Sequence, residues 1–278
     1  MKKRIASVLV ALACVGAANA WEFPGFEWTV GADITSSYLW RGINLGGLAF
    51  QPDASIGYGG LKAEVWANLS PSDYTFKTFA PELDVTLSYS VFGFKVGATH
   101  QYYFDGTKYF DFRKPTPAQY DAGDYAGNQT EVFFEYNLGD VLEDVPFHFG
   151  WYTYVGGDDW KTETDENDNT LSVERAWSTY IDLSYDFALP LNFTLTPTVG
   201  MTPWKSMYNY YEGNFSVNNV SLKLNWELEA GDHFCLDVYG IAMLNTAGIN
   251  KTNVWPAVSN SYNNQRLNLA LGIGLWLY

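Results

Sequence analysis

The feature that most constrains this chain is an alternation of apolar and polar side chains that recurs along most of its length. In residues 61–70, leucine, alanine and valine alternate with lysine, glutamate, asparagine and serine, and only Trp66 breaks the order. Residues 82–90, 181–187 and 221–228 repeat the pattern. A period of two is that of a β-strand with two unlike faces. The sequence therefore predicts an all-β fold.

The alternation predicts about twelve strands, an even number, as closed antiparallel barrels have. They are expected at 27–39, 48–58, 61–70, 82–90, 93–104, 129–138, 147–156, 174–187, 191–202, 216–228, 233–245 and 264–278. Alternate connections are short, and the others are mostly longer, above all 105–128, 157–173 and 246–263. Short turns at one end and long loops at the other are typical of an outer-membrane barrel. A soluble secreted β-sandwich is the alternative.

The first twenty residues have the layout of a secretory signal peptide. Residues 2–4 are basic, residues 5–15 are apolar, and Ala18-Asn19-Ala20 is a small-x-small cleavage site. We therefore expect a signal peptide at 1–20 and one barrel domain at 21–278, exported to the outer membrane of a Gram-negative cell. A lipoprotein cut before Cys14 is the alternative.

Composition narrows the possible partners. The formal charge is −15, and loss of the three basic signal residues would make it −18, which disfavours nucleic acid as a partner. Aromatic residues make up 18% of the chain, yet beyond the signal no apolar run reaches the ~18 residues of a membrane helix. A closed barrel is the other structure that satisfies its backbone within lipid. Cys235 is the only cysteine after the signal, so no intrachain disulfide is expected.

The last strand carries a continuous apolar row, and the chain ends on Tyr278. The row comprises Leu267, Leu269, Leu271, Ile273, Leu275 and Leu277. This segment resembles the final strand of bacterial outer-membrane proteins, and the resemblance implies recognition by the barrel-assembly machinery. Tyr278 departs from that pattern, because it alternates with the apolar row instead of sharing its face.

A second resemblance is carried by Trp40-Arg41-Gly42-Ile43, which Phe50-Gln51-Pro52 and residues 61–68 follow. This stretch resembles the opening of the TorF-type porin family, in which a turn of this kind precedes a glycine-rich hairpin. The resemblance covers about a sixth of the chain. It implies a small outer-membrane barrel with a porin function, and it names no substrate.

Polar residues of the alternating strands are the candidates for lining a lumen. They are the acids Asp53, Glu64, Asp84, Glu131, Glu135, Asp182, Asp186, Glu227 and Asp237 and the bases Lys62, Lys95, Lys223 and Arg266. The excess of acids predicts a channel that favours cations or neutral solutes over anions. The alternative is that these groups pair with one another and fill the interior, as in small barrels.

Passive diffusion of small solutes is the function that this pattern favours. A closed structural or adhesive barrel is the first alternative, and loop 105–128 is long enough either to fold inward or to project. A lipid hydrolase is the second, and it would need one of His100, His148 or His233 beside a serine or aspartate. The acidic run 164–169 lacks the glycine and final glutamate of an EF-hand loop, so no metal or cofactor is expected.

Overall fold

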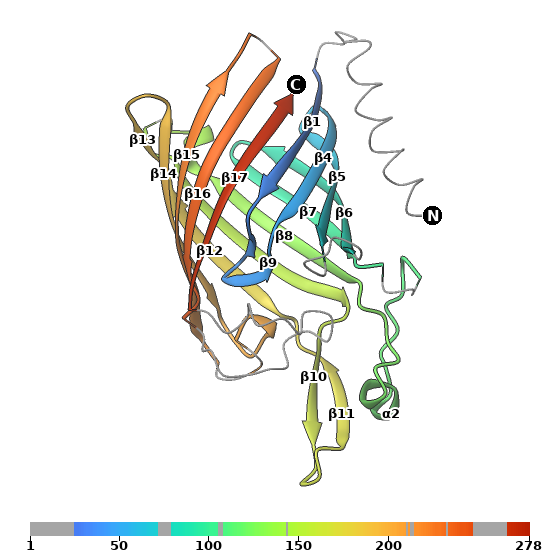
Figure 1. Ribbon diagram of the computed structural model, residues 1–278. Helices are drawn as coiled ribbons and strands as arrows, with labels where there is room; N and C mark the ends of the chain where they lie inside the picture. Colours follow the sequence, from blue (N-terminus) through green and yellow to red (C-terminus); the bar gives the residue numbers. More distant parts are fainter. Residues whose placement is uncertain are drawn as a thin grey trace.

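The computed structural model describes residues 25–71, 79–104, 108–142, 144–209, 211, 214–231, 233–246 and 266–278. The predicted signal peptide at 1–20 lies outside these residues. Within them, twelve strand positions close into one antiparallel barrel, as the sequence predicted (Figure 1). Over the same ranges, no helix is long and apolar enough to cross a membrane.

The barrel strands follow one another around the wall in chain order. They are β1 (Phe26–Thr35), β4 (Ala49–Tyr58), β5 (Leu61–Pro71), β6 (Phe79–Val91), β7 (Phe94–Tyr102), β8 (Gln129–Asn137), β9 (Phe147–Gly157), β12 (Thr179–Tyr185) with its continuation β13 (Phe187–Leu189), β14 (Phe193–Thr202), β15 (Ser216–Glu229), β16 (Phe234–Leu244) and β17 (Leu267–Leu277). Pairing of β1 with β17 joins the first and last strands of the barrel, and pairing of β12 with β14 completes the circle.

Two hairpins and a short helix lie in the connections. The strands β2 (Tyr38–Trp40) and β3 (Ile43–Gly46) form the first hairpin, and β10 (Trp160–Thr164) and β11 (Thr170–Arg175) form the second. The helix is α2 (Pro117–Asp121), and the 3₁₀ turns η1 (Leu138–Asp140) and η2 (Met207–Asn209) complete the described elements. Figure 1 shows β10, β11 and α2 at one end of the barrel, and the start of β1 and the end of β17 at the other.

Two predicted strands have different bounds in the structure. The strand expected at 27–39 ends at Thr35, because the next residues form the separate β2–β3 hairpin. The strand expected at 174–187 begins at Thr179, because Arg175 pairs with Trp160 in the β10–β11 hairpin, which we call the outer hairpin. The other ten predicted strands agree with the observed ones to within a few residues at each end.

The last strand shows how the two faces of the wall differ. Leu271 is 72% exposed, whereas Asn268 and Ala270 are each 3% exposed, so the leucine row faces outward and the even positions face the lumen. The outward face is apolar around the barrel. It exposes Ile34, Ile56, Val85, Leu87, Val96, Val132, Trp151, Val199, Leu222, Leu224, Val238, Leu269, Leu271, Ile273 and Leu275. Such a band, with its polar row inside, is the surface that a membrane barrel presents to lipid.

Glycines on the lumen face make room for aromatic rings. A Cβ at Gly200 on β14 would meet the ring of Tyr180 on β12, and a Cβ at Gly97 on β7 would meet the ring of Phe133 on β8. Both rings therefore lie over a glycine of a neighbouring strand, where no side chain is in the way. Aromatic rings that cover glycines in this way help to specify the register of a sheet.

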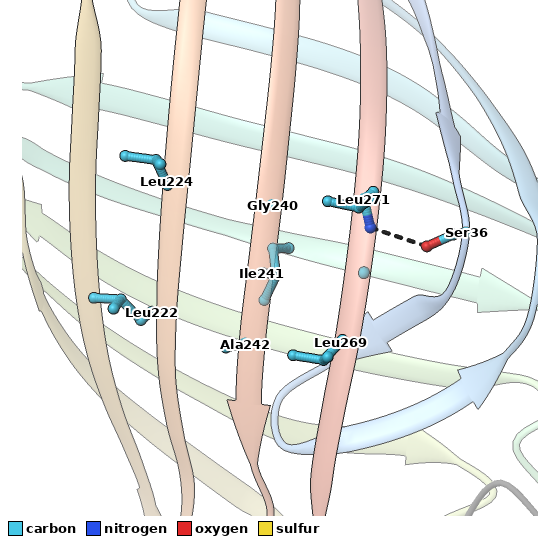
Figure 2. A pocket seen from close by; sticks show the side chains of 9 residues that line it. Ser36, Leu222, Leu224, Gly240, Ile241, Ala242, Leu269 and Leu271 are labelled. Atoms are coloured by element: carbon cyan, nitrogen blue, oxygen red, sulfur yellow. Dashed lines mark hydrogen bonds between the residues drawn. The ribbon is translucent and has the colours of Figure 1, made fainter.

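The outer wall carries a shallow apolar groove of about 520 Å³ over β15, β16 and β17. Figure 2 shows Leu222 and Leu224 on one side of Gly240, and Leu269 and Leu271 on the other. Ser36 lies at its edge, where its hydroxyl accepts a hydrogen bond from the Leu271 backbone N–H at 2.9 Å. The groove belongs to the apolar outer face, and the candidate functional residues lie inside the barrel.

Candidate functional site in the lumen

Cross-strand pairing places most of the predicted lining residues on the inward face. One row runs from Asp53 through Trp66 and Asp84 to Gln101, and Asp33 lies beside the lumen glycine Gly274. By the same register, the inward set includes Lys62, Glu64, Lys95, Glu131, Glu135, Asp182, Lys223, Glu227 and Asp237. Trp66, which broke the alternation of its strand, therefore points into the lumen.

Two predicted lining residues lie outside the regular strands. Asp186 occupies the break between β12 and β13, is exposed, and accepts a hydrogen bond from the Thr196 hydroxyl. Arg266 is exposed directly before β17, where its carbonyl accepts a hydrogen bond from the Asn245 N–H at 2.7 Å. Asp186 nevertheless continues the inward row of β12, because its partner Thr196 pairs with the inward-facing Lys223. Arg266 precedes the inward-facing Asn268 of β17 by two residues.

The β2–β3 hairpin, residues 38–46, crosses the lumen, and we call it the lumen hairpin. At one side the Tyr38 hydroxyl donates to Glu82 on β6 at 3.1 Å. At the other, a Cβ on Gly42 would meet the backbone of Asn218 on β15. Around the described wall, β6 and β15 are six strand positions apart. Since the barrel has twelve positions, these two strands face each other across its full diameter. Asn44 adds a hydrogen bond of 3.1 Å to Asn268 on β17.

The tip of the lumen hairpin is the segment that carries the resemblance to the TorF-type porins. Trp40 pairs with Ile43, and the two residues between them, Arg41 and Gly42, have φ values of 46° and 87°. Positive φ at both central positions is what a type I′ hairpin turn requires. Glycine adopts this region freely, whereas arginine does so at a cost of about 1–2 kcal/mol. The contacts of Arg41 must offset that cost.

Arg41 is held by an ion pair across the lumen. Its Nη2 donates to Oε1 of Glu131 on β8 at 2.9 Å, and its Nη1 donates both to the second Glu131 oxygen and to the Tyr208 hydroxyl, the latter at 2.8 Å. The two side chains are only 13% and 6% exposed. A bidentate pair of this kind is both strong and directional. It fixes the hairpin tip to the opposite wall.

Aromatic rings surround the same guanidinium, and we call them, together with Glu131, the aromatic cage. The Arg41 Cζ lies 4.0 Å from the ring centroid of Tyr152, 4.8 Å from Trp40, 5.2 Å from Tyr180 and 6.0 Å from Tyr208. These are distances at which ring faces attract a cation. Burial is the largest single effect and disfavours the charged form of Arg41, but the charge and hydrogen bonds of Glu131, together with Tyr208 and Tyr154, outweigh it and raise the pKa of the guanidinium well above its ordinary value. Arg41 therefore stays charged.

The side chains around the cage are buried. Tyr154 and Tyr180 are 0% and 1% exposed, and they pack with Ile43 of the lumen hairpin and with Met207 and Tyr208 of η2. Segments from the wall, the first loop and the loop before β15 thus form one buried cluster inside the barrel. This is the core of the molecule, and it lies in the lumen.

Toward the end where the short turns lie, the lumen opens, and we call this part the vestibule. Lys62 pairs with Glu64 at 2.5 Å and Lys95 with Glu135 at 3.0 Å, and the lysine side chains are 44% and 39% exposed. On the opposite wall, the liganding atoms of Glu227, Cys235 and Asp237 lie within 4.8 Å of one another. These are donor types that a metal ion accepts, but we assign no ion, because the cluster is part of the general acidic lining.

The three histidines have separate settings. His100 faces outward beside the long loops, where its ring nitrogens lie 2.8 Å from the Thr130 hydroxyl oxygen and 2.6 Å from the Tyr109 carbonyl oxygen. His148 lies in the vestibule with Nδ1 3.6 Å from Asp182. His233 lies at the short-turn end, 2.9 Å from the Tyr278 carbonyl oxygen. His148 is the one of the three histidines that lies beside an aspartate in the described residues, but it faces the lumen, whereas a lipid hydrolase would need its histidine on the lipid-facing side.

The sequence identified Arg41 and Glu131 separately but did not join them. It missed Tyr152, Tyr180, Tyr208 and Glu82 as parts of a site. Trp66 was a signal in the sequence that something packs inside the lumen, since a large aromatic residue on the polar face of a strand predicts a partner there. In the structure that partner is Tyr38 of the lumen hairpin, with ring centroids 5.7 Å apart.

The described residues define the structural class of the protein. It is a closed twelve-strand β-barrel with an acidic lumen, and a hairpin with an arginine at its tip crosses that lumen. No family model and no curated protein matches the chain. Solved structures match the chain at low similarity. Salmonella typhi OmpF in complex with daunomycin is 10% identical, with 90% of this chain and 97% of that chain covered and a TM-score of 0.38.

Two further structures show the same level of likeness. The CymD monoaromatic hydrocarbon channel is 9% identical over 91% of this chain and 87% of that chain, with a TM-score of 0.37. A chain solved in work on the in-meso crystallization of membrane proteins is 8% identical over 90% and 83%, with a TM-score of 0.41. The fold assignment rests on the strand pairing of this chain, and the function must be argued from its own residues.

Proposed function

We propose that this protein is an outer-membrane channel for passive diffusion of small solutes, with an acidic lumen that favours cations and neutral solutes over anions. The observation that carries the proposal is the contrast between the faces of the wall. Outside, an apolar band suits lipid, and inside, charged side chains stay open to solvent at the vestibule. A wall with these two faces separates lipid from an aqueous path.

The lumen hairpin is the constriction in this proposal. It crosses the full diameter, and its tip is fixed by Arg41 to Glu131. A solute that passes must either skirt the hairpin or displace its tip. The expected channel is therefore narrow, with long closed periods.

The partners that we propose follow from the same faces. Outer-membrane lipid covers the outward band, the barrel-assembly machinery reads β17, and small solutes enter the lumen. We propose no enzymatic role, because His100 contacts Thr130 and Tyr109, and because His148, which lies beside Asp182, faces the lumen and not lipid.

The closed structural barrel is the second candidate, and the buried cluster around Tyr154 and Tyr180 favours it. The reversal potential of the refolded protein in a planar bilayer under a salt gradient separates the two. A channel with an acidic lumen gives a reversal potential of the sign that cation preference requires. A folded barrel that gives no current supports the closed one, and anion preference overturns the selectivity.

A further inference from the structure

The half of the aromatic cage that belongs to the barrel wall forms a binding surface of its own. Glu131 on β8, Tyr152 on β9 and Tyr180 on β12 lie on three adjacent strands, and we call them the wall site. The Tyr152 hydroxyl donates to Glu135 at 3.0 Å, and the Tyr180 hydroxyl accepts from the Asn219 Nδ2 at 2.9 Å. Wall contacts therefore hold both rings in place independently of the hairpin.

The chemistry of the wall site selects one kind of cation. The Glu131 carboxylate can accept two parallel hydrogen bonds from one planar guanidinium group. An ammonium group does not present two parallel N–H donors in this way. The two rings of the wall site present faces to the cation at 4.0 and 5.2 Å. The carboxylate and the two rings surround the Arg41 guanidinium, which belongs to the lumen hairpin and not to the wall. Arg41 is thus a tethered occupant of a site that the wall supplies.

We propose that the wall site binds solutes carrying a guanidinium group, and that such solutes exchange with Arg41 at the tip of the lumen hairpin. This inference rests on the proposed channel function for its biological role, although binding itself does not need conduction. A solute that reaches the site through the acidic vestibule takes over the Glu131 oxygens and the Tyr152 face. Arg41 is then released, while the Tyr38–Glu82 and Asn44–Asn268 contacts keep the rest of the hairpin in the lumen.

Emptying the site without changing its wall tests the proposal. In Arg41→Ala, methylguanidinium at millimolar concentration should raise the thermal unfolding midpoint in a saturable way, relative to an equal concentration of methylammonium. In Arg41→Ala combined with Glu131→Gln, the affinity should fall by about tenfold or more, because the charge-assisted pair is lost. Wild-type protein should need a higher concentration of methylguanidinium than Arg41→Ala, because its own arginine competes.

Arg175 offers a matched control. Its Cζ lies 4.4 Å from the ring centroid of Trp160 in the outer hairpin, and its Nη1 donates to the Gly157 carbonyl, so it combines a ring with a neutral acceptor. Arg175→Ala should therefore show no more response to methylguanidinium than wild type. If Arg41→Ala does not fold, Arg41→Lys keeps the charge, and methylguanidinium should compete with that lysine at lower concentration than with the native arginine.

The outcomes separate this inference from the channel proposal. A folded Arg41→Ala, or Arg41→Lys in its place, that responds equally to methylguanidinium and methylammonium overturns the wall site. Binding that depends on Glu131 in a barrel that never conducts supports the wall site and counts against the channel. Binding together with block of the Arg41→Ala current by methylguanidinium supports both.

Discussion

Nη2 of Arg41 lies 2.9 Å from Oε1 of Glu131, so a residue of the first loop is paired with a strand ninety positions further along the chain, inside the barrel. This pair joins the hairpin that crosses the lumen to the wall that encloses it. We therefore expect the stability of the folded barrel and the closure of its lumen to depend on the same contact.

Breaking the pair from one side should destabilise the protein. Glu131→Gln leaves the Arg41 charge buried without its counter-ion, and we expect a loss of about 3–5 kcal/mol in the free energy of unfolding. Adding Arg41→Ala to it should cost less than the sum of the two single changes, because the stranded charge is removed. Urea unfolding of the four proteins in detergent measures this cycle. Additive losses would show that the pair contributes nothing of its own.

The opposite anchor of the hairpin should matter less to stability and more to closure. Tyr38→Phe removes one hydrogen bond to the buried Glu82, and we expect a loss of about 1–3 kcal/mol together with shorter closed periods. Tyr58→Phe is the control, because that ring is 65% exposed on the outside of β4. Equal effects of the two changes on the closed periods would contradict a role for Tyr38 in holding the hairpin.

Room for the Tyr180 ring depends on Gly200. A methyl group there would overlap the ring, so Gly200→Ala should lower stability by about 1–3 kcal/mol and displace Tyr180 from the cage. Gly47→Ala is a matched control, since a Cβ at that position meets nothing within 4 Å. Unfolding midpoints of the two variants provide the comparison. A Gly200→Ala protein as stable as Gly47→Ala would show that the ring does not need this gap.

Cation preference should depend on the acids of the vestibule. The double change Glu227→Gln and Asp237→Asn removes two inward charges, and the reversal potential under a salt gradient should move toward that of an unselective pore. Glu166→Gln, in the exposed turn of the outer hairpin, should leave the reversal potential unchanged. A shift of equal size in both variants would place the selectivity outside the lumen.

The cost of placing a charged side chain on the apolar outer face should depend on how deep in the bilayer that side chain lies. Leu271 lies in the middle of β17 and Leu277 at its end, and both are exposed on the outer face. Leu271→Arg should cost about 2–4 kcal/mol in a bilayer, whereas Leu277→Arg should cost about 0–1 kcal/mol. Folding titrations into lipid vesicles measure the two costs. Equal costs would contradict a membrane that covers the middle of β17.

The strands could be predicted from the sequence because each one repeats a period of two over enough residues to stand out locally. The lumen hairpin could not be separated from β1 in this way, since residues 27–39 read as one alternating run and only a turn at Ser36-Ser37 divides them. The cage could not be predicted either. Its members come from β8, β9, β12, η2 and the hairpin, and the register that brings them together is set by barrel closure, which no local pattern records.

Single-channel conductance of the refolded wild-type protein and of Arg41→Ala, compared in the same planar bilayer, tests the central claim most directly. A hairpin that closes an aqueous lumen predicts small or rare openings in the wild type and larger or more frequent ones once the tip is released. If both proteins are folded and heat-modifiable and neither conducts, the barrel is closed by its own core, and the channel proposal is contradicted.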